Sequence, residues 1–145
     1  MPSAVPDHPI LAIDHGQARI GLAATDALGI ASHPVDTIHT RRVDPLPRIA
    51  QIVEERRIRL ILLGLPLRLD GREGEAAHRV RAFGTELAGK IPAIPIQYSD
   101  ERLTTTSAAG KLREAGKSAR AQKDLIDQVA ALEILNDWLA ENECP

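Results

Sequence analysis

The stretch ILAIDHGQARIGLAATD, residues 10–26, decides the fold of this chain. Residues 10–13 form a continuous apolar run, which is typical of a buried β-strand. Asp14 follows where the run ends, and Gly16 suits a turn before the apolar pattern resumes over residues 20–24. The pattern therefore predicts two strands joined by a turn, with a carboxylate delivered to the end of the first strand.

The rest of the chain continues this start with alternating elements. Apolar periodicity, turn residues and capping residues predict a strand at 30–39, a helix at 44–58, a strand at 59–64, a helix ending near Lys90, a strand at 94–98, and helices at 104–116 and 123–139. Pro34 favours an irregular or edge position for the third strand. We expect an α/β fold, a mixed five-stranded sheet flanked by helices, in which an antiparallel start is followed by parallel additions.

Length and composition narrow the class of protein. The 145 residues suit one domain, residues 1–145, and the first eight residues are expected to be frayed. The one cysteine excludes a disulfide within the chain and a cysteine-based metal site. No signal sequence and no membrane-spanning run is recognisable, so the expected location is the cytoplasm, with no membrane partner. Three aromatic residues argue against a platform that stacks several bases.

Three acids occupy positions at which chemistry is expected. Asp14 ends the first strand, and Glu101 comes just after the strand at 94–98. Functional groups gather at the carboxyl ends of strands in α/β sheets. Asp127 lies on the apolar stripe of the last predicted helix, where a carboxylate is costly to bury unless a charge compensates it. A divalent cation bound by all three carboxylates would provide that compensation, and Mg²⁺ and Mn²⁺ prefer oxygen ligands.

Each acid also has a simpler explanation. Asp14 could be a turn former, and Glu101 could pair with Arg102 or lie in solvent. Asp127 could be buried in a salt bridge to an arginine or a lysine. Asp124, one turn earlier, is interpreted as the cap of the last helix.

Four stretches in this order resemble the YqgF family, also called RuvX, of the ribonuclease H-like superfamily. They are IDHGQARIGLAATD, LLGLPLRLDGREG, YSDERLTT and IDQVAALEIL, and the resemblance covers residues 9–140. It implies a ribonuclease H-like fold. One departure is Ala18, where the family usually has a basic residue before the RIG sequence.

The resemblance also implies a function. Members are regarded as divalent-metal nucleases, assigned either to maturation of the 5′ end of 16S ribosomal RNA or to resolution of Holliday junctions. By the motif match, Asp14, Glu101 and Asp127 correspond to the family's catalytic, metal-binding acids, with Mg²⁺ or Mn²⁺ as cofactor. The implied partners are pre-rRNA, branched or single-stranded DNA, and ribosomal precursor particles, for a monomer or homodimer.

The basic residues near these motifs are candidates for phosphate contacts. Arg19 and Arg102 adjoin the acids in the sequence, and three more candidates lie in a small, polar stretch interpreted as a mobile loop over residues 116–122 and its border: Lys117, Arg120 and Lys123. Each of them could instead be an ordinary solvated charge. Gly16 is interpreted as leaving room for a metal or phosphate, and Gly21 as permitting a close approach to the second strand.

Two other classes of protein remain possible from the residues. The spacing DHGQARIG also suits the first phosphate loop of a sugar kinase or actin-like ATPase, but that machinery needs two such domains and the chain is too short for both. A ribosome-assembly factor could keep the fold without activity. The three acids argue against that alternative, and a cleavage assay with acid-to-amide variants would decide it.

Overall fold

The computed structural model describes residues 8–102 and 120–142, without the side chains of residue 102 and of residues 120–123. Within these ranges it contains five strands and three helices. Their bounds are β1 Ile10–His15, β2 Arg19–Thr25, β3 Ser32–His39, α1 Pro45–Arg56, β4 Leu60–Leu67, α2 Glu75–Lys90, β5 Ile96–Arg102 and α4 Arg120–Asn142. The predicted helix at 104–116 lies outside the described residues.

The five strands form one mixed sheet in the order β3-β2-β1-β4-β5. β1, β2 and β3 are antiparallel neighbours, whereas β4 pairs parallel to β1 and β5 parallel to β4. This confirms the predicted antiparallel start with parallel additions. β3 is an edge strand, as Pro34 indicated, and its register with β2 shifts at Leu22 and Ala23.

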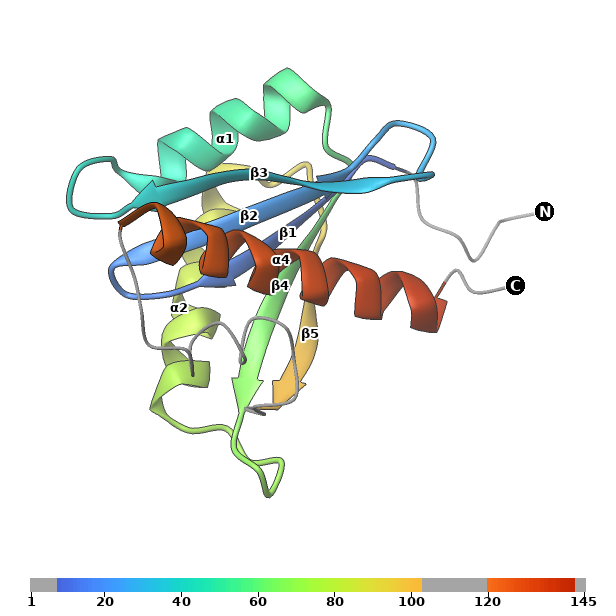
Figure 1. Cartoon of the computed structure of the whole chain (residues 1–145). Coiled ribbons are helices and arrows are strands. Elements are labelled where there is room, and N and C mark those ends of the chain that lie inside the picture. The colour runs from blue at the N-terminus through green and yellow to red at the C-terminus, as the bar shows by residue number, and fades with distance from the viewer. Residues whose placement is uncertain (1–7, 103–119, 143–145) are drawn as a thin grey trace.

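Helices cover both faces of the sheet (Figure 1). On one face α1 and α2 pack against alternate residues of the strands, among them Leu11 and Ile13 of β1. On the other face α4 alone, of the described helices, packs against the intervening residues, among them Ile10 and Ala12. Because β4 is covered on both sides, residues Leu60 to Leu65 are all buried, which explains their continuous apolar run.

Local signals explain where α1 starts and stops. Asp44 caps the helix by accepting a hydrogen bond from the Leu46 amide, and Pro45 occupies the first turn. Arg57 ends the helix in the left-handed conformation, with φ of 56°. Ile49, Ile52 and Val53, whose spacing in the sequence predicts the inner face of this helix, are buried. The predicted cap and inner face are therefore confirmed.

Several predicted boundaries were wrong. β4 runs on through Pro66 to Leu67, and β5 continues to Arg102, because the two strands keep pairing beyond the apolar run. The last helix begins at Arg120, so residues 120–122 are helical rather than part of a loop. Their sequence, Arg-Ala-Gln, consists of good helix formers.

Two smaller interpretations also change. Residues 1–7 lie outside the described residues, but His8, which was expected to be frayed, places Nδ1 2.8 Å from Thr25 Oγ1. Ala76, whose spacing to Val80, Phe83 and Leu87 in the sequence predicts a place on the inner face of α2, is exposed, and Ala77 is buried instead. Among the described residues, no helix is both long enough and apolar enough to span a membrane.

Candidate active site

The pleat of the sheet turns Asp14 toward α4. Alternate residues of a strand share a face, and Ile10 and Ala12 of β1 pack against α4. Asp14 is the next residue in that series. It is half-buried and sits directly opposite Gly21 of β2. The strand therefore delivers this carboxylate to the face covered by α4, at the end where β1 turns into β2.

Gly21 explains how α4 comes so close to the sheet at this point. A Cβ at Gly21 would overlap the backbone carbonyl of Asp127. The absence of a side chain lets the helix backbone rest on β2, beside Asp14. The predicted close approach at Gly21 is confirmed, and the element that approaches is the backbone of Asp127 itself.

Gly16 has a different role from the one predicted. Its amide donates a hydrogen bond of 2.9 Å to the Arg19 carbonyl, and a Cβ there would come within 2.6 Å of that oxygen. The glycine is thus required by the tight β1–β2 turn. The interpretation that Gly16 leaves room for a metal or phosphate is not needed.

Glu101 reaches the same face from β5. Gly64 of β4 pairs with Ser99, and Glu101 comes two residues further along β5. An added Cβ at Gly64 would lie 3.7 Å from the Glu101 Cγ. Continuing the β1–β4 register by one residue puts Gly64 level with Asp14. Two glycines therefore flank Asp14, one on each neighbouring strand. Both let α4 lie close to the sheet, because an added Cβ would meet the Asp127 backbone at Gly21 and the Ile134 side chain at Gly64.

Asp127 is the most buried of the three acids, and an arginine compensates it. Its side chain is 12% exposed, and Oδ2 accepts a hydrogen bond of 2.6 Å from the Nε of Arg19. Arg19 is the residue of β2 two positions before Gly21, so it lies on the same face. The structure thus contains the salt bridge that the sequence offered as one explanation of Asp127. Arg19 is the residue that forms it.

The pKa of Glu101 is raised to about 7, and burial of the carboxyl is the largest cause. The nearby carboxylates of Asp137, Glu133 and Asp14 contribute to this rise, in that order among the charges, and a hydrogen bond from the Ser99 hydroxyl opposes it. The influence of Asp14 shows that the two strand acids are electrostatic neighbours. Sequence reasoning missed Glu133 and Asp137, whose spacing of four residues on α4 could have indicated a shared acidic face.

A cavity of about 510 Å³ lies beside Glu101, between β5 and the second half of α4. Ser99, Asp137 and Trp138 are among its other lining residues. The Trp138 indole donates a hydrogen bond of 3.3 Å to Gln97, which ties the helix to the same strand. The walls around Glu101 are thus acidic, and a phosphate would enter only if a cation were also present.

The donor chemistry at this face suits a hard divalent cation, but the donors are not drawn together around one point. Among the residues with described side chains, no three His, Cys, Asp or Glu residues are grouped closely enough to hold a metal ion. The pairing of Asp127 with Arg19 accounts for part of this separation. A cation would have to draw the three carboxylates inward.

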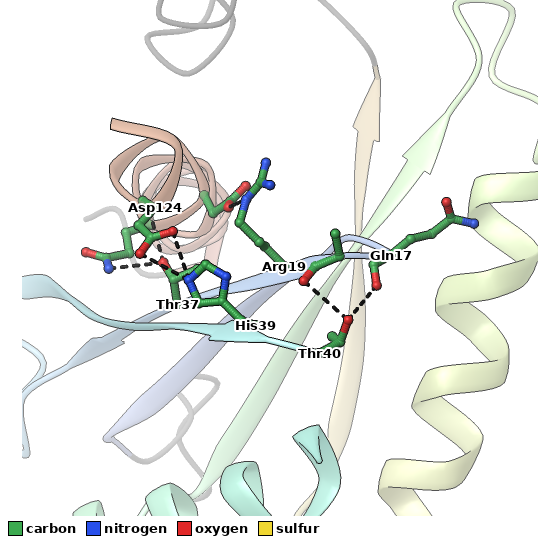
Figure 2. A network of polar contacts seen from close by, with 9 residues as sticks. Gln17, Arg19, Thr37, His39, Thr40 and Asp124 are labelled. Atoms are coloured by element: carbon green, nitrogen blue, oxygen red, sulfur yellow. Dashed lines mark hydrogen bonds and ion pairs between the residues drawn. The ribbon is translucent and has the colours of Figure 1, made fainter. Parts of the chain in front are cut away.

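A second set of polar contacts anchors the start of α4 on β3 (Figure 2). The Thr37 hydroxyl donates to the backbone carbonyl of Asp124 at 3.0 Å and accepts from the Gln128 amide. His39 Nε2 lies 3.1 and 3.2 Å from the two carboxylate oxygens of Asp124. Asp124 is therefore inside the helix and pairs with β3, so its interpretation as the helix cap was wrong.

The remaining predicted contacts are only partly visible. Arg102 ends β5, and Arg120 and Lys123 belong to the first turns of α4, but their side chains are not described. Lys117 lies outside the described residues. The roles of these four residues in binding stay predictions.

A model of a known protein family matches nearly the whole chain. The model described as "RuvX: Holliday junction resolvase" matches residues 8–141. This chain belongs to the RuvX family. A relative from Cutibacterium acnes, named "Putative pre-16S rRNA nuclease", is 47% identical over 131 residues, which cover 90% of this chain and 81% of the relative. A relative of the same name from Nocardia farcinica is 44% identical over 138 residues, or 90% and 77% of the two chains.

The similar solved structures agree on the fold. Thermus thermophilus RuvC matches with a TM-score of 0.54 and 16% identity over 92% of this chain and 96% of RuvC. The structure of T. thermophilus RuvC in complex with Holliday junction substrate matches with a TM-score of 0.53 and 15% identity, over 94% and 98%. The predicted ribonuclease H-like fold is confirmed, and the RuvX family and its relatives support a nuclease function.

The unusual pKa of Glu101 leads to a testable stability profile. Below a pH of about 4.5 the carboxyl is protonated in both folded and unfolded chains, whereas between about 4.5 and 7 only the folded state keeps the proton. The folded state therefore binds more protons in this window, and the metal-free protein should lose stability as the pH rises through it. Denaturant melts in EDTA across this range would measure the loss.

The matched comparison is with Glu101→Gln, which removes the titrating group. We expect the free energy of unfolding of this variant to vary less with pH than that of the wild-type protein, and to be higher at pH 8. Glu55→Gln on the exposed side of α1 should keep the wild-type profile. Parallel curves for wild type and Glu101→Gln would contradict the raised pKa.

Proposed function

We propose that this protein is a single-domain nuclease that hydrolyses phosphodiester bonds with Mg²⁺ or Mn²⁺ at Asp14, Glu101 and Asp127. The observation that carries the proposal is the placement of three carboxylates, from β1, β5 and α4, on one face of the sheet, where Gly21 lets α4 lie directly on β2. Membership in the RuvX family supports the same reaction.

The chain's own residues have separable roles in this proposal. Asp14, Glu101 and Asp127 would hold the metal, which when bound supplies an activated water and stabilises the leaving oxygen. Arg19 orients the Asp127 carboxylate by donating a hydrogen bond to Oδ2. Glu101 binds a cation only when ionised, so the affinity of the protein for the metal should rise with pH up to about 7, the pKa of the metal-free carboxyl.

We propose pre-16S rRNA as the substrate, because the relatives at 47% and 44% identity are named pre-16S rRNA nucleases. The 5′ end is the proposed cleavage region, as the family resemblance implies. The proposed setting is the cytoplasm, on ribosomal precursor particles. Arg102, Lys117, Arg120 and Lys123 are proposed to contact the phosphate backbone. The second candidate substrate is a four-way DNA junction, which the description of the family favours.

The test is an assay in which the purified protein is incubated with Mn²⁺ or Mg²⁺ and one of three substrates. The substrates are a pre-16S 5′ fragment, single-stranded DNA and a four-way DNA junction. We expect the RNA to be cut at a defined site and all cleavage to stop in excess EDTA, since the ligands are hard carboxylates. Cleavage that persists in EDTA would rule out the metal mechanism.

Variants of the acids separate this function from its rivals. Asp14→Asn should fold and lack cleavage, whereas a non-catalytic assembly factor would show no cleavage even as the wild-type protein. Titration calorimetry with ATP tests the ATPase alternative. Tight ATP binding without nuclease activity would overturn the proposal.

A further inference from the structure

The turn between β3 and α1 carries two adjacent arginines, Arg41 and Arg42, to which no role has been assigned. Both side chains are exposed. The turn itself is well defined, because the amides of Arg42 and Val43 both donate to the His39 carbonyl, at 2.9 and 3.0 Å. The two cations therefore project from a short, hydrogen-bonded stretch of backbone.

This turn is fastened to the β1–β2 turn beside the acids (Figure 2). The Thr40 hydroxyl donates to the carbonyls of Gln17 at 2.8 Å and Ala18 at 3.2 Å, and the Thr40 amide donates to Ala18 at 3.1 Å. Arg19 follows Ala18 and pairs across the sheet with His39. The position of Arg41 and Arg42 relative to Arg19 and Asp127 is thus set by backbone contacts.

Among the side chains that the structure describes, neither of these two arginines has a hydrogen-bond or ion-pair partner. The acids near the turn are otherwise engaged, since Asp44 caps α1 and Asp124 pairs with His39. Elsewhere on the described surface, arginines with carboxylate partners include Arg48 with Asp36 and Arg81 with Glu73.

We propose that Arg41 and Arg42 form a binding site for the phosphate backbone of a nucleic acid, on the β3 side of the active site. This inference rests on the proposed nuclease function. Arginine suits the partner, because its planar guanidinium can donate two hydrogen bonds to one phosphate. The acids and the arginines then follow the order of the strands across the sheet. Glu101 lies on β5, Asp14 on β1 and Arg19 on β2, and the turn with Arg41 and Arg42 follows β3.

The strand spacing indicates which phosphate is bound. Two interstrand steps separate β1 from β3, or roughly 10 Å. The arginines would therefore contact a phosphate that neighbours the scissile one along the strand, and not the scissile phosphate itself. They should therefore strengthen binding and leave the chemical step unchanged.

The experiment measures the salt dependence of binding. The probe is a short, fluorescently labelled single-stranded RNA, bound in EDTA so that it is not cleaved. We expect Arg41→Gln with Arg42→Gln to weaken binding and to reduce the slope of log K against log salt by about one for each phosphate that the variant no longer neutralises. In cleavage assays with metal, KM should rise and kcat should stay unchanged.

The matched control is Arg56→Gln with Arg57→Gln. This pair lies at the other end of α1, away from Asp14, and removes the same charge from two adjacent exposed arginines. An unchanged slope in the control supports a localised site. If the slope changes equally in both double variants, or in neither, the inference is overturned. The proposed function still stands in that case if the wild-type protein cleaves nucleic acid. A wild-type protein that neither binds nor cleaves nucleic acid overturns both.

Discussion

Replacing Gly21 with alanine should destabilise the protein by about 3 kcal/mol, at the upper end of the usual cost of overpacking. The new Cβ would overlap the backbone carbonyl of Asp127, and neither backbone can move aside as a flexible side chain could. The helix α4 must shift away from β2. Because α4 buries Ala131, Leu135 and Trp138 against this face, the shift also opens the apolar core.

The melting temperature should fall by about 10 °C, given two to four degrees per kcal/mol for chains of this size. Cleavage per folded molecule should also drop, because Asp127 moves with the helix. Gly89→Ala is the matched control, since nothing lies within 4 Å of an added Cβ there. Alanine at that helical position should be neutral or stabilising by up to about 1 kcal/mol. A Gly21→Ala protein as stable as Gly89→Ala would disprove the close packing of α4 on β2.

Replacing Asp127 with asparagine should abolish most cleavage and also lower stability. The change keeps the shape of the side chain but removes the charge that faces Arg19 at 2.6 Å. A fully buried pair would cost about 3–5 kcal/mol when broken. Here Arg19 is 34% exposed and can turn to water, and asparagine can still accept one hydrogen bond, so we expect a loss of about 1–3 kcal/mol.

Cleavage by Asp127→Asn should fall at least about a hundredfold, because even residues that only orient a ligand are worth ten- to a hundredfold. Asp36→Asn is the control: it breaks a more exposed ion pair, with Arg48 at 3.3 Å, and should cost under about 1 kcal/mol with activity unchanged. Melts in EDTA and cleavage rates per folded molecule give both quantities. Lower stability with retained cleavage would make Asp127 a structural residue and remove it from the site.

The sequence by itself predicted a mixed sheet with an antiparallel start, and it placed Asp14 at the end of the first strand. The apolar run before Asp14, the glycine-containing turn and the edge proline at Pro34 each reflect local rules, because burial on two faces, tight turns and missing amides constrain residues directly. The capping residue Asp44 follows the same logic. These interactions involve neighbours along the chain or a repeating pattern, so a linear sequence displays them.

The residues at which the strands end could not be predicted from local patterns in the sequence. Glu101 was expected just after its strand, but it pairs opposite Pro66 inside β5. Residues 99–102 are Ser-Asp-Glu-Arg and carry no apolar signal. Their strand conformation comes from the parallel pairing with β4, which is an interaction between segments more than thirty residues apart in the sequence.

Only the tertiary structure decided which side chain faces the acid on the helix. The apolar stripe showed that Asp127 must be compensated, and left a metal and a salt bridge as alternatives. Arg19, which was interpreted as a phosphate contact, is separated from Asp127 by 108 residues and meets it because Gly21 lets α4 lie directly on β2. Pairing across such a distance depends on helix placement, which no local pattern in the sequence encodes.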